Sequence, residues 1–324
     1  MSPCLEAKQN FVGESYCLCI IYAFRCSSQI VTRQHNEKIS KHTFKPFQPD
    51  DEVQIDRIQI AHHLYRVIWD GNFSSPVKAR LSKGGAKVLD IGCGPGTWIC
   101  DMATDFPKSS FIGVDYVPTF PTEKPTNVQF IVGDILEGLD FGEEEFDFIN
   151  MRQMALWFSE EQYKKQVIPE LTRLLKVGGW LEISESEFQA HLIGPKFKEY
   201  LVSQMAKYNR NPDVLYELEA CLGQFSNISR DKRKIPVGSN DKIIGQYCAM
   251  LCVPLMLEIL SEHVLKLSHK KCEKMVKEVI DEANKYNSKS NCYDKGLLGM
   301  QDVEVPFTIE EYEVFQVVGN DNFP

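Results

Sequence analysis

The chain of 324 residues has no hydrophobic run long enough to span a membrane, no cysteine pair spaced C-x-x-C and no excess of basic residues. The apolar stretch at residues 16–24 is far shorter than the about 20 residues that cross a bilayer. The acidic Glu6 and Glu14 also interrupt the basic start that a secretory signal needs. We therefore expect a soluble, cytoplasmic protein with no membrane partner, and the sequence leaves a nuclear location open.

Charge and cysteine content exclude two further classes of protein. Lys and Arg number 36 against 45 Asp and Glu, which gives a net charge of -9. Proteins that bind nucleic acid usually carry a basic face, so we expect no nucleic-acid partner. The 11 cysteines are an odd number, which is typical of free thiols in a reducing compartment rather than of a disulfide framework. Cys248 and Cys252 share a helix face, but no His or acidic cluster completes a metal site there.

The stretch from Lys87 to Asp115 has the pattern of a nucleotide-binding βαβ unit. A buried strand over 87–91 leads into a turn with three glycines, and a helix over 97–105 leads into a second buried strand over 111–115. Glycine allows the unusual dihedral angles of such a turn and lets a ligand approach the backbone. The pattern therefore predicts a ligand at the start of the helix.

The glycine spacing separates this turn from a dinucleotide site. NAD-binding turns follow G-x-G-x-x-G, whereas Gly92, Gly94 and Gly96 are evenly spaced and Thr97 stands where a third NAD glycine would be. Asp90 at the end of the first strand would repel a pyrophosphate and attract a cation. S-adenosylmethionine (SAM), which carries a sulfonium and an ammonium, fits this turn better than NAD does. An NAD-dependent oxidoreductase remains an alternative that nicotinamide binding would test.

Asp115 ends the second strand about 20 residues beyond the turn, the spacing at which a carboxylate meets a ribose in related folds. A carboxylate can accept hydrogen bonds from both ribose hydroxyls. The alternative is a carboxylate that only closes the turn after the strand. Strand ends on this edge of an open α/β sheet face the ligand, so Asn150, Met151 and Arg152 are further candidates. Arg152 is expected to pair with Asp90 or with a substrate carboxylate.

The run Asp90-Ile-Gly-Cys-Gly-Pro-Gly96 resembles motif I of the class I SAM-dependent methyltransferases. A closer resemblance is to fungal methyltransferases of the trans-aconitate-methyltransferase-like and LaeA-like group. It is carried by His35-Asn36, Glu52-x-x-x-Asp56-Arg57, Asn72-Phe-Ser-Ser-Pro76-Val77 and the run 88–182. The resemblance implies an α/β fold with a doubly wound, mostly parallel seven-stranded sheet and helical additions. Its final strand would insert antiparallel beside the parallel half.

The resemblance also implies the cofactor site. In such enzymes the acid after the third strand accepts from the adenine amino group, and the next apolar side chain packs on the ring. Asp134 and Ile135 match these two positions. The expected SAM-binding residues are Asp90, Gly92, Cys93, Gly94, Pro95, Gly96, Asp115, Tyr116, Asp134, Ile135, Met151 and Arg152.

Outside the turn, hydrophobic periodicity predicts the remaining elements. An amphipathic helix from Asp51 would lie beside the cofactor domain, and Asn72 to Pro76 would end it before a short helix that runs to about Leu81. The resemblance implies that such an N-terminal helix covers the SAM pocket. Pro169 would kink or break a helix over 160–176, with Gly178 as its C-cap. We expect strands at 127–132, 146–151, 180–184, 228–237 and 312–318, and helices at 241–260 and 269–286.

The expected organisation is a poorly ordered extension over 1–48 and one methyltransferase domain over 49–324. The core of that domain spans 82–185, with helical substrate or lid additions at 186–222 and 240–290.

The predicted function is methyl transfer from SAM to an unidentified acceptor, with a small molecule favoured and a protein substrate or regulatory partner left open. The alternative is a regulatory scaffold that keeps a SAM-binding fold. His62, His191, Glu185 and Glu187 are candidate bases, and none is assigned as catalytic.

Overall fold

The structure is a computed structural model, and it describes residues 52–154, 157–186, 221–222, 225–235 and 309–318, with a few single positions between 199 and 278. The expected extension over 1–48 and the helix at 241–260 lie outside the described residues, as do most of the additions at 186–222 and most of the helix at 269–286. So do His191 and Glu187. The domain limits given above stay a prediction.

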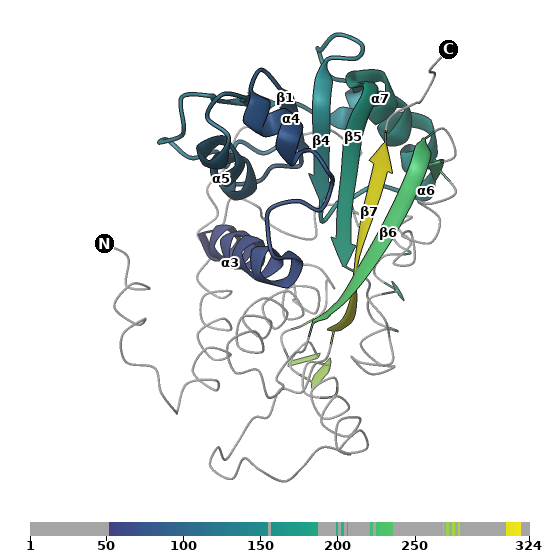
Figure 1. Ribbon diagram of the computed structural model, residues 1–324. Coiled ribbons are helices and arrows are strands. Elements are labelled where there is room, and N and C mark those ends of the chain that lie inside the picture. The colour runs from purple at the N-terminus through teal and green to yellow at the C-terminus, as the bar shows by residue number, and fades with distance from the viewer. Residues whose placement is uncertain are drawn as a thin grey trace, which may run out of the picture.

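A seven-stranded sheet in the order β3-β2-β1-β4-β5-β7-β6 organises the described chain. The first five strands run parallel, and β7 lies antiparallel between β5 and β6. Figure 1 shows β7 pointing against β4 and β5. The expected doubly wound, mostly parallel fold with an inserted final strand is therefore confirmed. The strands are β1 Lys87–Ile91, β2 Ser110–Asp115, β3 Val128–Val132, β4 Phe146–Arg152, β5 Leu175–Ser186, β6 Ser226–Ile235 and β7 Ile309–Val318.

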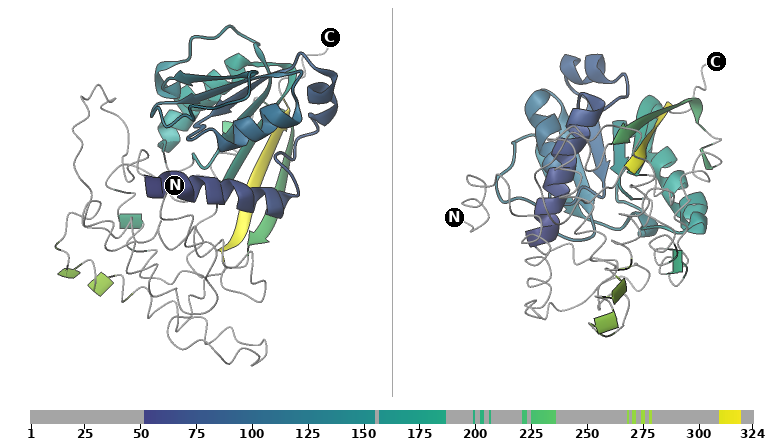
Figure 2. Two further views of the ribbon diagram at one scale, coloured as in Figure 1. Left: turned by 90° about the vertical axis from the view of Figure 1, so that its left-hand side faces the viewer. Right: turned by 90° about the horizontal axis from the view of Figure 1, so that it is seen from below.

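The helices are α3 Glu52–Trp69, α4 Lys78–Lys83, α5 Thr97–Asp105, the 3-10 turn η2 Ile135–Glu137, α6 Glu160–Gln162, the π-helical turn η3 Tyr163–Val167 and α7 Ile168–Leu174. Figure 2 shows α3 crossing beneath the carboxyl ends of the parallel strands. This placement agrees with the expectation that the first helix lies beside the cofactor-binding edge.

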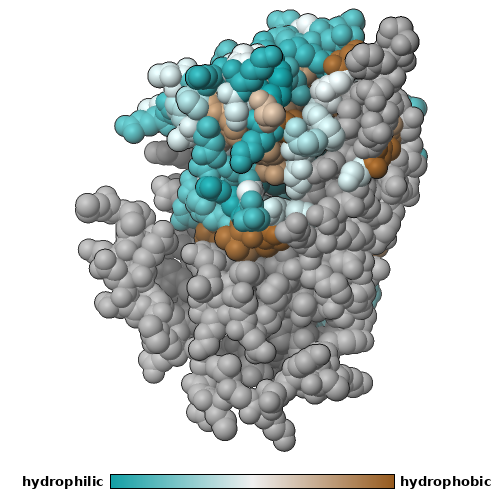
Figure 3. All heavy atoms as spheres, viewed as in Figure 1, coloured by the Kyte–Doolittle hydropathy of each residue, from teal (hydrophilic) through white to brown (hydrophobic). Residues whose placement is uncertain are grey.

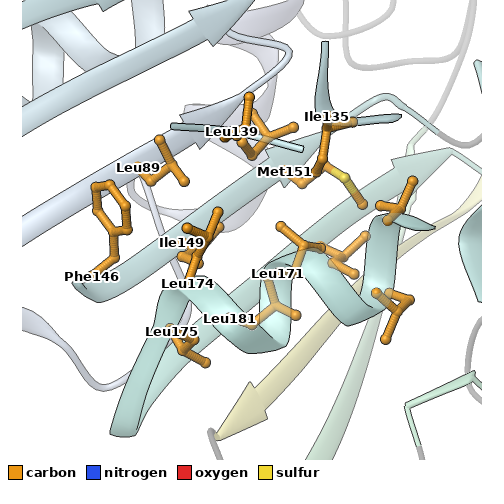
Figure 4. Packing of buried hydrophobic residues seen from close by; sticks show 14 of the residues in the cluster. Leu89, Ile135, Leu139, Phe146, Ile149, Met151, Leu171, Leu174, Leu175 and Leu181 are labelled. Atoms are coloured by element: carbon orange, nitrogen blue, oxygen red, sulfur yellow. The ribbon is translucent and has the colours of Figure 1, made fainter. Parts of the chain in front are cut away.

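Alternating side chains give the sheet two hydrophobic faces. On one face, Leu89 and Ile149 belong to a core cluster that packs on α7 through Leu171, as Figure 4 shows. On the other face, Val88 and Phe148 pack on α5 and α4. Parallel strands that are covered on both faces read as continuous apolar runs, which is why the sequence predicts β1, β2 and β4 to within one residue.

The region between β4 and β5 corrects two expectations. The predicted helix over 160–176 is divided into α6, η3 and α7, and it ends at Leu174. Pro169 occupies the first turn of α7, where its missing N–H costs nothing, so the break precedes it as a π-helical turn. Strand β5 starts at Leu175 rather than Trp180, and Gly178 lies inside it with φ 74° instead of capping a helix.

A buried carboxylate ties the segment before α4 to the sheet. Glu182 on β5 is 3% exposed, and its oxygens accept hydrogen bonds from the backbone N–H groups of Ser74 and Ser75 and from the Ser75 hydroxyl. The run Asn72-Phe-Ser-Ser-Pro76 therefore does more than end a helix. It supplies the donors that a buried carboxylate needs.

The surface in Figure 3 is largely hydrophilic around α4 and α5, with apolar side chains near the level of α3. Val67 on α3 is 63% exposed. No helix within the described residues has both the length and the apolar character needed to cross a membrane.

Candidate functional site

The glycine turn after β1 has the backbone that the sequence predicts. Gly92, Gly94 and Gly96 have φ values of 68°, 52° and 72°, a region that residues with a Cβ rarely adopt. A Cβ on Gly92 would come within 2.4 Å of Met154 Sδ, and one on Gly96 would come within 2.4 Å of Phe130 Cζ. Gly92 and Gly96 are therefore required both by the turn and by their neighbours.

The two other residues of the turn, Cys93 and Pro95, are buried. Burial raises the pKa of the Cys93 thiol, so it stays protonated and serves as a small packing residue. At Gly94, by contrast, an added Cβ would come no closer than 3.9 Å to its nearest neighbour, the Ile58 side chain on α3. The Gly94 side of the turn therefore faces Ile58 on α3, and a Cβ there would make only ordinary van der Waals contact.

Asp115 at the end of β2 holds the turn from the opposite side. One carboxylate oxygen accepts from Gly94 N at 2.8 Å, and the other accepts from Val117 N at 3.0 Å. Burial raises the pKa of Asp115, whereas these backbone hydrogen bonds favour its ionised form. Both interpretations made from the sequence are therefore compatible with this carboxylate: it closes a turn, and it retains lone pairs for two ribose hydroxyls.

A row of buried polar residues crosses the sheet on the face that packs on α5. Asp90 lies opposite Gly113 on β2 and opposite Asn150 on β4, and Asn150 lies opposite Glu182 on β5. Each strand starts with an apolar side chain on this face and turns polar toward its carboxyl end. The three polar residues are at most 4% exposed, so the row is part of the interior.

Asp90 is the acid of this row that lies nearest the turn. Asn150 Nδ2 donates to Asp90 Oδ1 at 2.7 Å. Burial raises the pKa of Asp90 to about 7, against the opposing effects of Asn150 and of the positive charge of Arg152. A buried carboxyl with this pKa binds a cation favourably, because the cation replaces the solvation that ionisation requires.

Asp134 presents an unsatisfied acceptor. Its Oδ1 accepts from Leu136 N at 2.9 Å and so caps η2, whereas its Oδ2 is buried without a hydrogen-bond partner. Buried polar atoms are nearly always paired, so an orphan acceptor indicates a missing donor. An adenine amino group is such a donor, and this observation fits the expected cofactor.

Tyr116 lies close to both acids. Burial raises the pKa of Tyr116 to about 12, with further contributions from the charges of Asp115 and Asp134. Its ring makes an edge contact with the Trp157 ring, and the two ring centres are 6.2 Å apart. The expected adenosyl-binding residues Asp115, Tyr116 and Asp134 are thus brought together at the ends of β2 and β3.

Two of the expected cofactor residues are deeply buried. Met151 has 0% exposure and lies in the core cluster on the opposite face of β4 from Asn150, so its side chain offers no surface to a ligand. Ile135 lies in the same cluster at 5% exposure, which leaves little surface for an adenine ring. Side chains alternate between the two faces of a strand, so Met151 points to the opposite face of the sheet from its neighbour Asn150.

His62 and Arg152 form a contact that the sequence does not predict. His62 on α3 is fully buried, with Nε2 at 2.8 Å from Asp101 Oδ2 and Nδ1 at 3.3 Å from an Arg152 amino group. The Arg152 guanidinium also lies over the Tyr65 ring at 4.8 Å. His62 therefore has both ring nitrogens engaged, which argues against its role as a general base. His63 is exposed.

Glu185, the other candidate base within the described residues, is 2% exposed, and its Oε1 accepts from Met154 N at 2.6 Å. No group of three or more His, Cys, Asp or Glu in the described part of the chain is placed to hold a metal ion.

Comparison with known proteins agrees with this geometry. Residues 88–179 match the family model described as a methyltransferase domain. Methyltransferase pytC of Aspergillus terreus is 31% identical over 212 residues, which cover 60% of this chain and 61% of that protein. Secondary metabolism regulator laeA of Aspergillus fumigatus is 32% identical over 152 residues, 44% of this chain and 36% of that protein. N-methyltransferase verN of Clonostachys rogersoniana is 29% identical over 162 residues, which cover 47% of this chain and 54% of that protein.

The sheet order and the glycine turn are those that the resemblance to class I SAM-dependent methyltransferases implies, and residues 88–179 match a methyltransferase domain. The chain is also similar to the fungal methyltransferases and laeA-type regulators just described, as the sequence motifs predict. The alignments span about three-fifths or less of these relatives.

Proposed function

We propose that this chain binds SAM at the carboxyl edge of β1, β2, β3 and β4 and transfers its methyl group to a small-molecule acceptor. The orphan oxygen of Asp134 carries the proposal, because it lies beside Tyr116 and Asp115 and lacks the donor that an adenine would provide. Relatives named as methyltransferases, among them an N-methyltransferase, support the reaction class.

Each acid has a separate role in this proposal. Asp134 accepts from the adenine amino group, Asp115 accepts from the ribose hydroxyls, and Asp90 faces the cationic methionine end. The glycine turn brings the backbone close to the ligand, and an added Cβ at Gly94 would meet only the Ile58 side chain of α3. Each of these roles pairs one acid with a polar or charged group of SAM, and none requires a metal.

Bound SAM supplies a methyl group that is already activated by the sulfonium charge. The residues of the chain then need only hold the acceptor in line with that methyl group and exclude water, which can lower the barrier by about 7 to 11 kcal/mol. Helix α3 crosses the strand ends and is fixed there by the contacts of His62 and Arg66 with Asp101. It is placed to exclude water from this edge.

Isothermal titration of the full chain with SAM and with S-adenosylhomocysteine (SAH) tests the site, and Asp115→Ala should weaken both ligands. Asp140→Ala, which alters an exposed acid, is the matched control. Mass spectrometry of a small-molecule extract incubated with the chain and isotopically labelled SAM tests the transfer. Absence of binding heat would overturn the SAM site. Binding without any labelled product would instead favour a regulatory protein that retains the cofactor fold.

A further inference from the structure

A chain of hydrogen bonds runs from α5 through α3 to the end of β4. Asp101 Oδ2 lies 2.8 Å from His62 Nε2, and His62 Nδ1 lies 3.3 Å from an Arg152 amino group. His62 is completely buried between its two partners, and Asp101 is further fixed by Arg66, whose NH1 donates to Oδ2 at 2.8 Å. The imidazole therefore has a single orientation.

The chemistry of the partners determines the direction of each bond. A guanidinium has only donors, so His62 Nδ1 must be the acceptor from Arg152. The proton of the neutral imidazole is then on Nε2, from which it is donated to the Asp101 carboxylate. Burial and the charge of Arg152 lower the pKa of His62 to about 4, which is consistent with a neutral ring at physiological pH.

The guanidinium is fixed on a second side as well. It lies over the Tyr65 ring at 4.8 Å from the ring centre, and Tyr65 is one helical turn beyond His62 on α3. Arg152 itself is only half-buried, and it follows Asn150 on the polar face of β4. Two contacts from one helix thus hold a cation at the edge of the sheet where the strands end.

The acid of the glycine turn belongs to the same polar face as this cation. Asp90 lies opposite Asn150 in the register of β1 and β4, and Arg152 is two residues beyond Asn150 on that face. The positive charge of Arg152 also lowers the pKa of Asp90 and of Glu182, in opposition to the larger effect of burial. An acid and a guanidinium on one face of the sheet match the ammonium and carboxylate of an α-amino acid. The methionine end of SAM carries both groups.

We propose that His62 is a positioning residue: held by Asp101, it fixes the Arg152 guanidinium so that Arg152 pairs with the methionine carboxylate of SAM. This inference rests on the proposed function and specifies which part of the cofactor the β4 end recognises. It also means that α3 contributes to recognition of the cofactor in addition to covering the sheet edge.

Decarboxylated SAM provides the test, because it keeps the adenosyl group, sulfonium and amine and lacks only the carboxylate. The measured quantity is the ratio of the dissociation constants of decarboxylated SAM and SAM for the full chain. We expect the unmodified chain to prefer SAM by about 10- to 100-fold, the range of a charge-assisted pair. Arg152→Gln should reduce the ratio to near one.

His62→Phe, which fills the same space without hydrogen bonds, should reduce the ratio by about tenfold through weaker SAM binding, with decarboxylated SAM changed less than about threefold. His62→Gln keeps a donor and an acceptor on one amide and should restore part of the ratio. His63→Gln on the same helix alters an exposed ring and should leave both ligands unchanged. Thermal unfolding checks that each variant folds.

The outcomes separate the two proposals. If the unmodified chain binds neither ligand, the SAM site itself is wrong. If His62→Phe weakens both ligands equally, His62 is merely structural and the positioning role is overturned. If the unmodified chain binds decarboxylated SAM and SAM equally well, Arg152 does not pair with the methionine carboxylate. A raised KM for the acceptor in Arg152→Gln would then assign the guanidinium to an acceptor carboxylate.

Discussion

Asp90 and Asn150 lie directly opposite each other on β1 and β4, and the Asn150 amide donates to the Asp90 carboxyl at 2.7 Å in the interior of the sheet. Asp90 is 4% exposed and so gains almost no solvation from water. Its position is costly for the free protein and favourable for a bound cation. The acid of the glycine turn thus lowers the stability of the free chain and favours ligand binding.

Replacement of this acid should stabilise the free protein above neutral pH. The pKa of Asp90 is raised from 3.8 to about 7 in the folded state, so the folded chain binds more protons than the unfolded chain between these values. Stability contributed by the protonated carboxyl is therefore lost as pH rises from about 4 to about 7. Asp90→Asn should be as stable as the unmodified chain near pH 4 and more stable at pH 8, by on the order of 2 to 4 kcal/mol.

Urea unfolding at pH 4 and pH 8 measures this difference, with Asp140→Asn as an exposed control. The same Asp90→Asn variant should bind SAM more weakly. Equal unfolding midpoints at pH 8 would show that Asp90 is not buried as a costly acid.

Asp134→Asn should make the site prefer a base with an acceptor in place of the adenine amino group. The Asn oxygen can still cap η2 by accepting from Leu136 N, but the other atom becomes an amide donor where the orphan acceptor stands. Two donors then face each other, and SAH affinity should fall by about 10- to 100-fold. S-inosylhomocysteine carries an acceptor at that position and should bind the variant better than SAH does. Titration with both ligands measures the change, and an equal loss for both would contradict the assignment of Asp134 to adenine.

The sequence predicts the sheet and the glycine turn well because their signals are local. Buried parallel strands are uniformly apolar, and the spacing of Gly92, Gly94 and Gly96 follows from the backbone angles of the turn. Helix 160–176 is less predictable, because a π-helical turn and an early β5 depend on packing against the sheet rather than on local propensity.

The contacts between distant elements are what the sequence does not predict. Nothing near His62 indicates that Asp101 lies beside it. Strand direction alone also does not predict that Met151 lies in the core cluster, because it does not fix which face a residue occupies. Glu182 does carry a usable signal. It lies between Leu181 and Ile183 in an alternating strand, and a charge at a buried position requires donors, which the Ser74-Ser75 segment supplies.

Ser75→Ala should destabilise the chain by about 1.5 to 3 kcal/mol, because the Ser75 hydroxyl donates to the buried Glu182 carboxylate at 2.6 Å. The two backbone donors remain, so the variant should still fold. Ser82→Ala on α4 removes an exposed hydroxyl and should change stability by less than about 0.5 kcal/mol. Urea unfolding of the two variants gives the comparison, and equal midpoints would contradict a stabilising role for the Ser75 hydroxyl.

Gly96→Ala and Gly178→Ala separate backbone strain from steric contact in the glycine turn. Their φ values of 72° and 74° both lie in the region that residues with a Cβ rarely adopt, so Ala carries a backbone cost at both positions. At Gly178 the Cβ would meet nothing within 4 Å, whereas at Gly96 it would lie 2.4 Å from Phe130 Cζ. Displacement of Phe130 from its stack on Phe120, where the ring centres are 4.8 Å apart, should add about 1 to 3 kcal/mol at Gly96 alone. If urea unfolding gives the two variants the same loss, the turn glycine is required by its dihedral angles and not by the close approach of Phe130.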